Sequence, residues 1–183
     1  MFIRADQFEF VSDLKKNWRE IQAEYLALAE DVFEPWVQRE MYGKGWNVYV
    51  LQAFGKRIEP ALATCPRTAL HVSMIPGLIT AGFSRLEPQA HIKPHIGWVQ
   101  SVYRLHLGLV VPELCGLRVG NEIRSWTEGE CLIFDDTVEH EAWNKSNQIR
   151  AILLLDFLRP GLNDSSGDVM PGKVKRFVRR STR

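Results

Sequence analysis

The chain has 183 residues, of which 45% are hydrophobic and 25% charged, and its formal net charge is +1 at pH 7. This length and composition fit one globular domain with a single hydrophobic core. A net charge so close to zero gives no electrostatic reason to expect nucleic acid or an acidic macromolecule as a partner.

Targeting and membrane signals are absent from the sequence. The first ten residues, MFIRADQFEF, contain neither the apolar core nor the small-residue cleavage site of a secretory signal. No window approaches the roughly 18 apolar residues of a membrane span. Three cysteines without a close pair argue against a disulfide framework or a CxxC zinc site: Cys65, Cys115 and Cys131. We therefore expect a free-standing cytoplasmic protein with reduced, buried thiols.

The first third of the chain predicts helix. Apolar residues recur at steps of three and four, as on one face of an amphipathic helix, at Leu14, Trp18, Ile21, Tyr25 and Leu28. Ser12 is the candidate N-cap, and Pro35 should end the helix or follow its end. We expect this helix to cover one face of a sheet. A second, short helix is predicted over 68–74, closed by Pro76 and Gly77.

From Trp46 onward the pattern favours strands. Turn signals such as Glu87-Pro88 and Pro112-Glu113 separate many of the β-like segments. Gly120-Asn121 should form a tight hairpin. Many short strands with close turns favour a β-sandwich or barrel. The predicted strands are 46–51, 78–86, 91–94, 103–111, 116–119, 122–126, 131–134, 139–143 and 150–157.

The end of the chain differs in composition. Residues 163–168 have a loop-like sequence, and a basic stretch without acidic residues follows at Lys173, Lys175, Arg176, Arg179, Arg180 and Arg183. We expect a solvated tail, with contact to an acidic partner or another subunit as the alternative. The predicted organisation is one domain over 1–160, with a helical part (1–76) and a β core (77–160), followed by a loop and basic tail (161–183).

Two of the five histidines stand in a context that suggests a metal site. Iron oxygenases commonly hold iron(II) with two histidines and one carboxylate. His95 is followed two residues later by Gly97, where a carboxylate would be expected, and His140 supplies a distal histidine. Arg150 begins a late apolar strand. A guanidinium there suits a dicarboxylate cosubstrate, because arginine pairs bidentately with carboxylates.

Taken together, these segments resemble the aspartyl/asparaginyl β-hydroxylase family. Six motifs occur in order between residues 83 and 160: HIKPHIG (91–97), RLHLGL (104–109), WTEG (126–129), FDD (134–136), HEAW (140–143) and Arg150. The resemblance implies a mainly β double-stranded β-helix (a jelly-roll, cupin-like barrel) with flanking N-terminal helices. It also implies an iron(II)- and 2-oxoglutarate-dependent dioxygenase that hydroxylates an unactivated carbon and releases succinate and CO2.

The resemblance also assigns roles to residues. The family uses two histidine ligands with a glycine in place of the carboxylate, so His95 and His140 would bind the metal. Ser84 and Arg150 would hold the distal carboxylate of 2-oxoglutarate, and Arg104 and His106 would flank that cosubstrate. The i, i+2 spacing of the last two puts both side chains on one sheet face, here the barrel interior.

Several neighbouring residues allow two interpretations. On an extended strand His91 would lie about 13 Å from His95, which favours a structural role unless Pro94 bends the chain sharply. The acidic residues Asp135, Asp136 and Glu139 either form a turn that aims His140 inward or provide the missing carboxylate, and we favour the turn. A halide could also fill the position that Gly97 leaves open, although the flanking motifs favour hydroxylation.

The substrate is less defined. Gly82 and Val102 stand beside Ser84 and Arg104 on the same sheet faces, and neither can pair with a substrate carboxylate, although Lys93, Arg85 or Arg118 could. The candidates are a free amino acid, a carrier-bound residue, a peptide and a lipid-linked acyl chain. The alternative function is a non-catalytic, cupin-like metal- or ligand-binding module. A zinc hydrolase is disfavoured, because catalytic zinc usually has three protein ligands.

Overall fold

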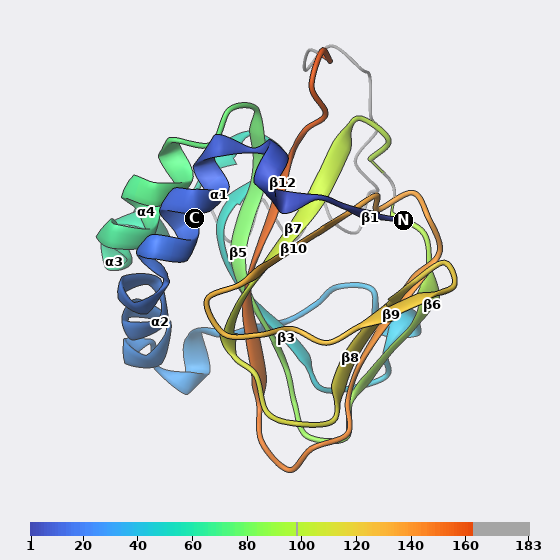
Figure 1. Ribbon diagram of the computed structural model, residues 1–183. Helices are drawn as coiled ribbons and strands as arrows, with labels where there is room; N and C mark the ends of the chain where they lie inside the picture. The colour runs from blue at the N-terminus through green and yellow to red at the C-terminus, as the bar shows by residue number, and fades with distance from the viewer. Residues whose placement is uncertain (98, 163–183) are drawn as a thin grey trace.

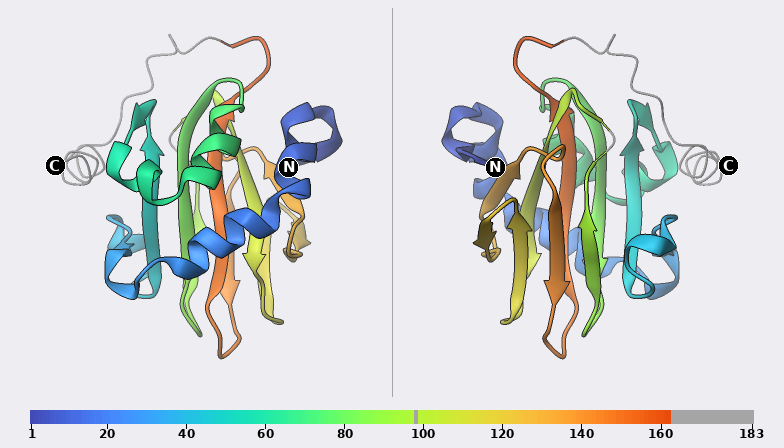
Figure 2. Two further views of the ribbon diagram at one scale, coloured as in Figure 1. Left: turned by 90° about the vertical axis from the view of Figure 1, so that its left-hand side faces the viewer. Right: turned by 90° about the vertical axis from the view of Figure 1, so that its right-hand side faces the viewer.

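Helices gather on one side of the protein in the structure, a computed structural model that describes residues 1–97 and 99–162. They are α1 (Glu9–Lys16), α2 (Trp18–Ala27), α3 (Glu59–Thr64) and α4 (Pro66–Ser73). Short 3-10 turns are η1 (Ala5–Gln7), η2 (Glu30–Val32) and η3 (Arg39–Met41), and η3 lies beside β6 of the smaller sheet. Figures 1 and 2 show the α-helices against one face of the larger of two sheets. No helix in these ranges is long and apolar enough to cross a membrane. The predicted loop at 163–168 and the basic tail lie outside the described residues.

The strands form two antiparallel sheets. The larger has the order β1-β10-β7-β12-β5-β3-β2, with β4 paired to β3, and the smaller has the order β6-β11-β8-β9. Strand bounds are β1 (Phe2–Ile3), β2 (Glu34–Pro35), β3 (Trp46–Ala53), β4 (Lys56–Arg57), β5 (Leu78–Leu86), β6 (His91–His95), β7 (Val102–Val110), β8 (Cys115–Val119), β9 (Glu122–Arg124), β10 (Cys131–Phe134), β11 (His140–Asn144) and β12 (Arg150–Leu158).

The eight strands from β5 to β12 define the fold. Strands β5, β7, β10 and β12 lie side by side in the larger sheet, and β6, β8, β9 and β11 make up the smaller one. The chain therefore passes back and forth between two facing sheets, which is the winding of a double-stranded β-helix. The fold class expected from the sequence, a mainly β jelly roll with N-terminal helices, is confirmed.

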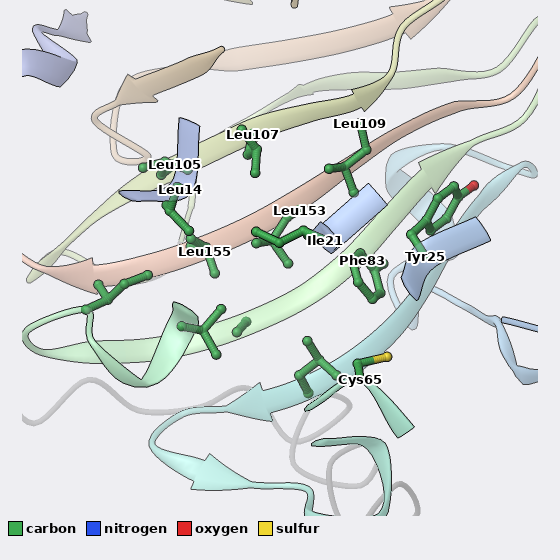
Figure 3. Packing of buried hydrophobic residues seen from close by; sticks show 14 of the residues in the cluster. Leu14, Ile21, Tyr25, Cys65, Phe83, Leu105, Leu107, Leu109, Leu153 and Leu155 are labelled. Carbon is green, nitrogen blue, oxygen red and sulfur yellow. The ribbon is translucent and has the colours of Figure 1, made fainter. Parts of the chain in front are cut away.

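Alternation along the larger sheet separates the hydrophobic core from the barrel interior. Leu105, Leu107 and Leu109 of β7 are fully buried and belong to the cluster that packs against the helices, as Figure 3 shows. The residues between them face the other way, because successive side chains of a strand point to opposite faces. Arg104 and His106 therefore point into the barrel.

Two details of the predicted N-terminal helix were wrong. The single helix over 14–28 is two helices, α1 and α2, which meet at Asn17. The Asn17 amide donates hydrogen bonds to the backbone oxygen and to Oδ1 of Asp13, both at 2.9 Å, and its φ and ψ of −107° and 12° are not helical. Asparagine competes in this way with the helical backbone. Ser12 is not an N-cap but lies inside α1, where its hydroxyl donates to the Glu9 carbonyl.

The cysteines match the expectation. Cys65, Cys115 and Cys131 are all buried and free. Burial raises the pKa of the thiols of Cys65 and Cys131 to about 12, so both stay protonated at neutral pH. These two therefore act as small apolar side chains in the core, whereas the Cys115 thiol donates to Oδ1 of Asn144 at 3.2 Å.

The Asn144 side chain links the end of β11 to the end of β5 and to the loop before β12. Its fully buried amide donates to the backbone oxygens of Leu86 and Gln148 at 2.9 and 2.7 Å, and its oxygen accepts from Ser146. We expect Asn144→Ala to lower the free energy of unfolding by about 2–4 kcal/mol, because it leaves buried backbone groups unpaired. Urea denaturation would measure this. The matched change at exposed Asn147 should cost less than about 0.5 kcal/mol, and equal effects would contradict the assignment.

Candidate active site

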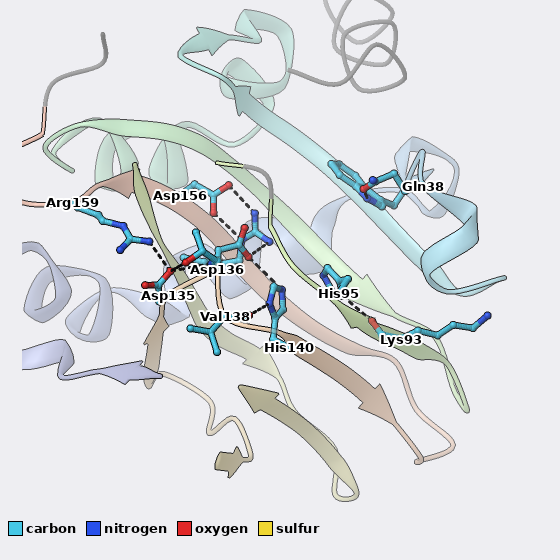
Figure 4. A network of polar contacts seen from close by, with 12 residues as sticks. Gln38, Lys93, His95, Asp135, Asp136, Val138, His140, Asp156 and Arg159 are labelled. Carbon is cyan, nitrogen blue, oxygen red and sulfur yellow. Dashed lines mark hydrogen bonds and ion pairs between the residues drawn. The ribbon is translucent and has the colours of Figure 1, made fainter. Parts of the chain in front are cut away.

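His95 and His140 face each other at one end of the barrel interior. They are register partners on the antiparallel strands β6 and β11 of the smaller sheet. Their rings lie 4.1 Å apart between centroids and are tilted by 56°, and Figure 4 shows both side chains directed into the same space. The structure thus brings together the two histidines, 45 positions apart in sequence, that the sequence analysis selected.

Backbone carbonyls fix the tautomer of both rings. Nδ1 of His95 lies 2.7 Å from the Lys93 oxygen, and Nδ1 of His140 lies 2.9 Å from the Val138 oxygen. A carbonyl accepts only, so the proton of each neutral ring stands on Nδ1. Each Nε2 is therefore left with a lone pair. In metal sites, a histidine is commonly oriented in this way: one ring nitrogen, here Nδ1, donates to a backbone carbonyl and leaves the other, Nε2, free to bind the metal.

Both rings are neutral at physiological pH. Burial lowers the pKa of His95, and burial together with His95 and Arg104 lowers the pKa of His140 to about 3. Metal ligation requires neutral imidazole. In addition, Nε2 of His140 lies 3.3 Å from Oδ1 of Asp136. Arg104 Nη1 lies 2.7 Å from the same oxygen and offsets its charge. The donor set that fits a bound metal ion is therefore the pair of neutral imidazoles, because each keeps a free Nε2 lone pair.

Asp136 fills the space beside Gly97. A Cβ atom added to Gly97 would lie 1.6 Å from Oδ2 and 2.2 Å from Cγ of Asp136. The Gly97 amide also donates to the Asp136 carbonyl at 2.7 Å. Position 97 therefore accepts only glycine while the Asp136 carboxylate stays in place. Within 1–97 and 99–162, no cluster of three or more His, Cys, Asp or Glu residues is arranged to hold a metal.

The other acidic residues lie outside the site. Asp135 caps the turn before β11, because its Oδ1 accepts from the backbone and hydroxyl of Thr137 at 3.0 and 2.7 Å. Glu139 pairs with Arg118 on the outer face. Asp136, by contrast, is 1% exposed and belongs to the site. The turn interpretation thus holds for Asp135 but misses Asp136.

His91 points away from the two histidines. It is exposed, and its Nε2 lies 2.7 Å from Oε2 of Glu141. A register shift between His95 and Ile92 breaks the alternation of β6, so His91 faces outward while His95 faces inward. His91 therefore does not share a site with His95, in line with the structural role that the sequence favoured.

Beside the histidines lies a small cavity of about 30 Å³. All six residues that the sequence analysis named line it: Ser84, His95, Arg104, His106, His140 and Arg150. Apolar side chains, including Leu117, Phe134 and Ile152, form the remaining wall. The cavity thus combines two cations with a water-excluding surface.

Arg150 is a buried cation with few partners. It is 1% exposed, and its Nε and Nη1 have no hydrogen-bond partner among the described residues. Its guanidinium lies 4.7 Å from the ring centroid of Trp126. Burial lowers its pKa to about 10, which leaves it charged at neutral pH. An unpaired buried charge is costly, so the position is suited to an anionic ligand.

His106 and Ser84 add polar atoms to the same cavity. The Trp126 indole donates to Nδ1 of His106 at 3.3 Å, so the proton of His106 stands on Nε2, which is buried without a partner. Burial, and then the charges of Arg150 and Arg104, lower the pKa of His106 well below its ordinary value. The Ser84 hydroxyl accepts from the Trp46 indole at 3.0 Å and keeps its own proton for a ligand.

Arg104 is held by two carboxylates. Its Nε and Nη2 donate to Asp156 at 2.8 and 3.0 Å, and its Nη1 lies 2.7 Å from Oδ1 of Asp136. Burial opposes the charge of Arg104, but both carboxylates outweigh it and raise its pKa. The sequence analysis missed Asp156. The sequence feature that could have identified Asp156 is its position as a charged residue inside the apolar strand β12. It lies six positions after Arg150 and therefore on the same face.

Fold and site together define a jelly-roll protein with a two-histidine candidate metal centre and a cationic pocket inside the barrel. A model of the family described as aspartyl/asparaginyl beta-hydroxylase matches residues 15–160. The chain belongs to this family.

Two relatives show how the family varies. The chain is 46% identical over 118 residues to an ornithine lipid ester-linked acyl 2-hydroxylase of Rhizobium tropici, which covers 63% of this chain and 42% of the relative. It is 34% identical over 174 residues to the human aspartyl/asparaginyl beta-hydroxylase, which covers 89% of this chain and 23% of the relative. The chain thus spans less than half the length of either protein.

Solved structures with some likeness are cupin proteins. One is the cupin domain of a transcriptional regulator from Enterobacter cloacae, at a TM-score of 0.45 and 12% identity over 63% of this chain and 99% of that one. Another is a sugar phosphate isomerase from Silicibacter pomeroyi, at 0.43 and 14% over 70% of this chain and 68% of that one. The fold assignment rests on the strand order described above.

Proposed function

We propose that the protein is an iron(II)- and 2-oxoglutarate-dependent dioxygenase that hydroxylates an unactivated carbon of its substrate. Membership of a hydroxylase family supports the class of reaction. His95 and His140 would hold the iron, which would supply oxidation of a C–H bond by dioxygen while 2-oxoglutarate is converted to succinate and CO2. The protein's part is to bind, orient and exclude water.

The observation that carries this proposal is the unpaired charge of Arg150 beside two neutral histidines. Arg150 and the Nε2 proton of His106 offer buried donors without acceptors in the cavity that His95 and His140 also line. A dicarboxylate satisfies such donors with charge-assisted hydrogen bonds. Its other end, a 2-oxo acid, is a chelating group that would reach the two histidines' metal.

Each cavity residue then has a role. Arg150 would bind the distal carboxylate and Ser84 would donate to it, while Trp126 orients the arginine by stacking on its guanidinium. Arg104, which also lines this cavity, would face the other end of the cosubstrate. Phe134 and Leu117 keep bulk water away, which strengthens every charge interaction inside.

Anaerobic titration of the protein with iron(II) and 2-oxoglutarate tests the proposal. We expect the weak visible charge-transfer absorption of a 2-oxoglutarate chelate to appear and saturate. Under oxygen the same mixture should release succinate when substrate is present. If iron and 2-oxoglutarate bind neither together nor separately, the proposal is wrong and a non-catalytic binding module becomes the favoured function.

Arg150→Met separates this role from a structural one. Methionine fills similar volume without charge, so the unfolding free energy should stay unchanged or rise, because a buried unpaired charge is removed. The dissociation constant of 2-oxoglutarate should increase about 10- to 150-fold, the value of a lost charge-assisted interaction, while iron(II) binding is kept. Titration of the charge-transfer band measures both.

The matched control is Arg118→Met. Arg118 pairs with Glu139 and Glu141 on the outer face of the smaller sheet and lines neither the cavity nor the groove beside it. Its replacement should leave 2-oxoglutarate affinity unchanged. A wild-type affinity in Arg150→Met would contradict the assignment of the distal carboxylate to Arg150.

A further inference from the structure

A second hollow, which we call the apolar groove, adjoins the candidate metal site. It has a volume of about 90 Å³. His95, Ser84 and Arg104 line both this groove and the cavity of about 30 Å³ beside the histidines, which we call the cosubstrate cavity. From His95 the groove passes along the inner faces of β5, β12 and β3. Its walls include Trp36, Met41, Trp46, Val50, Phe54 and Leu154. A molecule in this groove would therefore lie next to His95.

Away from the candidate metal site, the tryptophan and threonine side chains of the groove wall are already paired within the protein. The Trp36 indole donates to Gln38 at 3.1 Å, and the Trp46 indole donates to Ser84. Thr80 hydrogen-bonds to Asp156, which Arg104 also binds. A peptide backbone in the groove would bring donors and acceptors that need partners. The wall has few to offer, so an occupant without polar groups fits best.

The charges of the groove also disfavour an acidic substrate. Among the described residues that line it, Arg104 is the only lysine or arginine, and it is shared by the carboxylates of Asp136 and Asp156. Lys93, Arg85 and Arg118, which the sequence left as possible partners, do not line the groove. Arg85 instead lies over Phe33 and pairs with Glu30 on the helix side of the sheet.

A lysine or arginine cannot be accommodated at position 82, where the backbones of β5 and β3 lie close together. Gly82 lines the groove, and a Cβ atom there would lie 2.8 Å from the Tyr49 carbonyl and 3.2 Å from Cα of Val50 on the paired strand β3. Any side chain at this position would push β3 away. The close approach of the two backbones thus keeps this part of the groove free of side-chain charge.

We infer that the substrate is an unbranched acyl chain that lies in the apolar groove and is hydroxylated at a methylene next to His95. This inference rests on the proposed function and names its substrate class. One oxygen atom of dioxygen enters a C–H bond to give C–OH, and the other enters succinate as 2-oxoglutarate loses CO2. The four electrons that dioxygen accepts come two from the C–H bond and two from 2-oxoglutarate.

Binding of acyl probes tests the inference without iron. The probes are monodecanoylglycerol, a neutral ester, and decanoate, a free acid, with an aspartate-containing peptide as the acidic alternative. Because Trp36 and Trp46 line the groove, acyl binding should change tryptophan fluorescence saturably. The ester and the free acid distinguish an ester-linked chain from a free one. Saturable binding of the peptide alone would overturn the inference.

A variant and a control locate the binding. Met41 lines the groove but not the cosubstrate cavity, and Met41→Arg should weaken the acyl probe at least tenfold while the 2-oxoglutarate charge-transfer band is retained. Ile123→Arg, on the exposed strand β9 outside the groove, should leave acyl binding unchanged. Equal acyl binding in wild type and Met41→Arg would overturn the inference.

The two proposals fail separately. In the loaded enzyme under oxygen, mass spectrometry should show a decanoyl chain with one added oxygen, matched by succinate. A charge-transfer band without acyl binding or acyl product would overturn the acyl inference and leave the proposed function standing. Acyl binding without a charge-transfer band would overturn the proposed function and leave the groove as an acyl-binding site.

Discussion

His140→Ala should abolish tight iron(II) binding and, with it, turnover. Under the proposed function the iron has two histidine ligands, His95 and His140, so the loss of one leaves a single strong donor. Changes to residues that merely orient a ligand already cost about 10- to 100-fold in metal affinity, and removal of a ligand should exceed the upper value. We expect iron(II) affinity to fall more than about a hundredfold. Isothermal titration and the metal content of the purified protein would measure this loss.

His91→Ala is the matched control for this variant. His91 lies on the same strand as His95 but faces outward and pairs with Glu141. Its removal should leave iron(II) affinity within about twofold of wild type, because His91 faces away from the candidate metal site and the exposed ion pair that is lost contributes little to stability. Apoprotein of both variants should unfold cooperatively, which shows that the fold is intact. Equal iron loss in the two variants would mean that metal binds outside the barrel.

Much of the β core could be predicted because its pattern is local. Strands β5 and β10 have the bounds expected from the sequence, and Gly120, at a φ of 57°, makes the predicted β8–β9 hairpin. Apolar runs with turn residues between them carry this information. Strands β1, β2 and β4 have two residues each and show no periodicity. Only their tertiary neighbours define them.

The site was predicted as a set of residues but not as a network. The resemblance to the family selected six side chains that line one cavity, yet it gave no sign that two carboxylates hold Arg104. Asp135 and Asp136 are adjacent in sequence, but the Asp135 carboxylate accepts from Thr137 in the turn while the Asp136 carboxylate contacts Arg104 inside the barrel. Partners from β7, β12 and the turn before β11 meet only in three dimensions, and no local pattern encodes such contacts.

Gly97→Ala should be strongly destabilising, because position 97 is filled by its neighbour. The new Cβ would lie 1.6 Å from Oδ2 of Asp136, so that carboxylate would have to move. Its movement would break the contact with Arg104 at 2.7 Å, inside the barrel. Overpacking and the loss of a buried ion pair together predict a loss of about 3–5 kcal/mol in unfolding free energy. Urea denaturation of the apoprotein would measure it.

The double variant Gly97→Ala/Asp136→Ala tests the cause. Truncation of Asp136 removes Cγ and both carboxylate oxygens, so of the three atoms nearest to the added methyl group only the Asp136 backbone oxygen, at 2.9 Å, remains. The two changes should therefore be less than additive, with a coupling energy of about 1–3 kcal/mol. Simple additivity would show that the strain lies elsewhere. If the coupling is found, a carboxylate cannot be restored at position 97 by Gly97→Asp alone, because Asp136 already occupies the volume through which that side chain would have to pass.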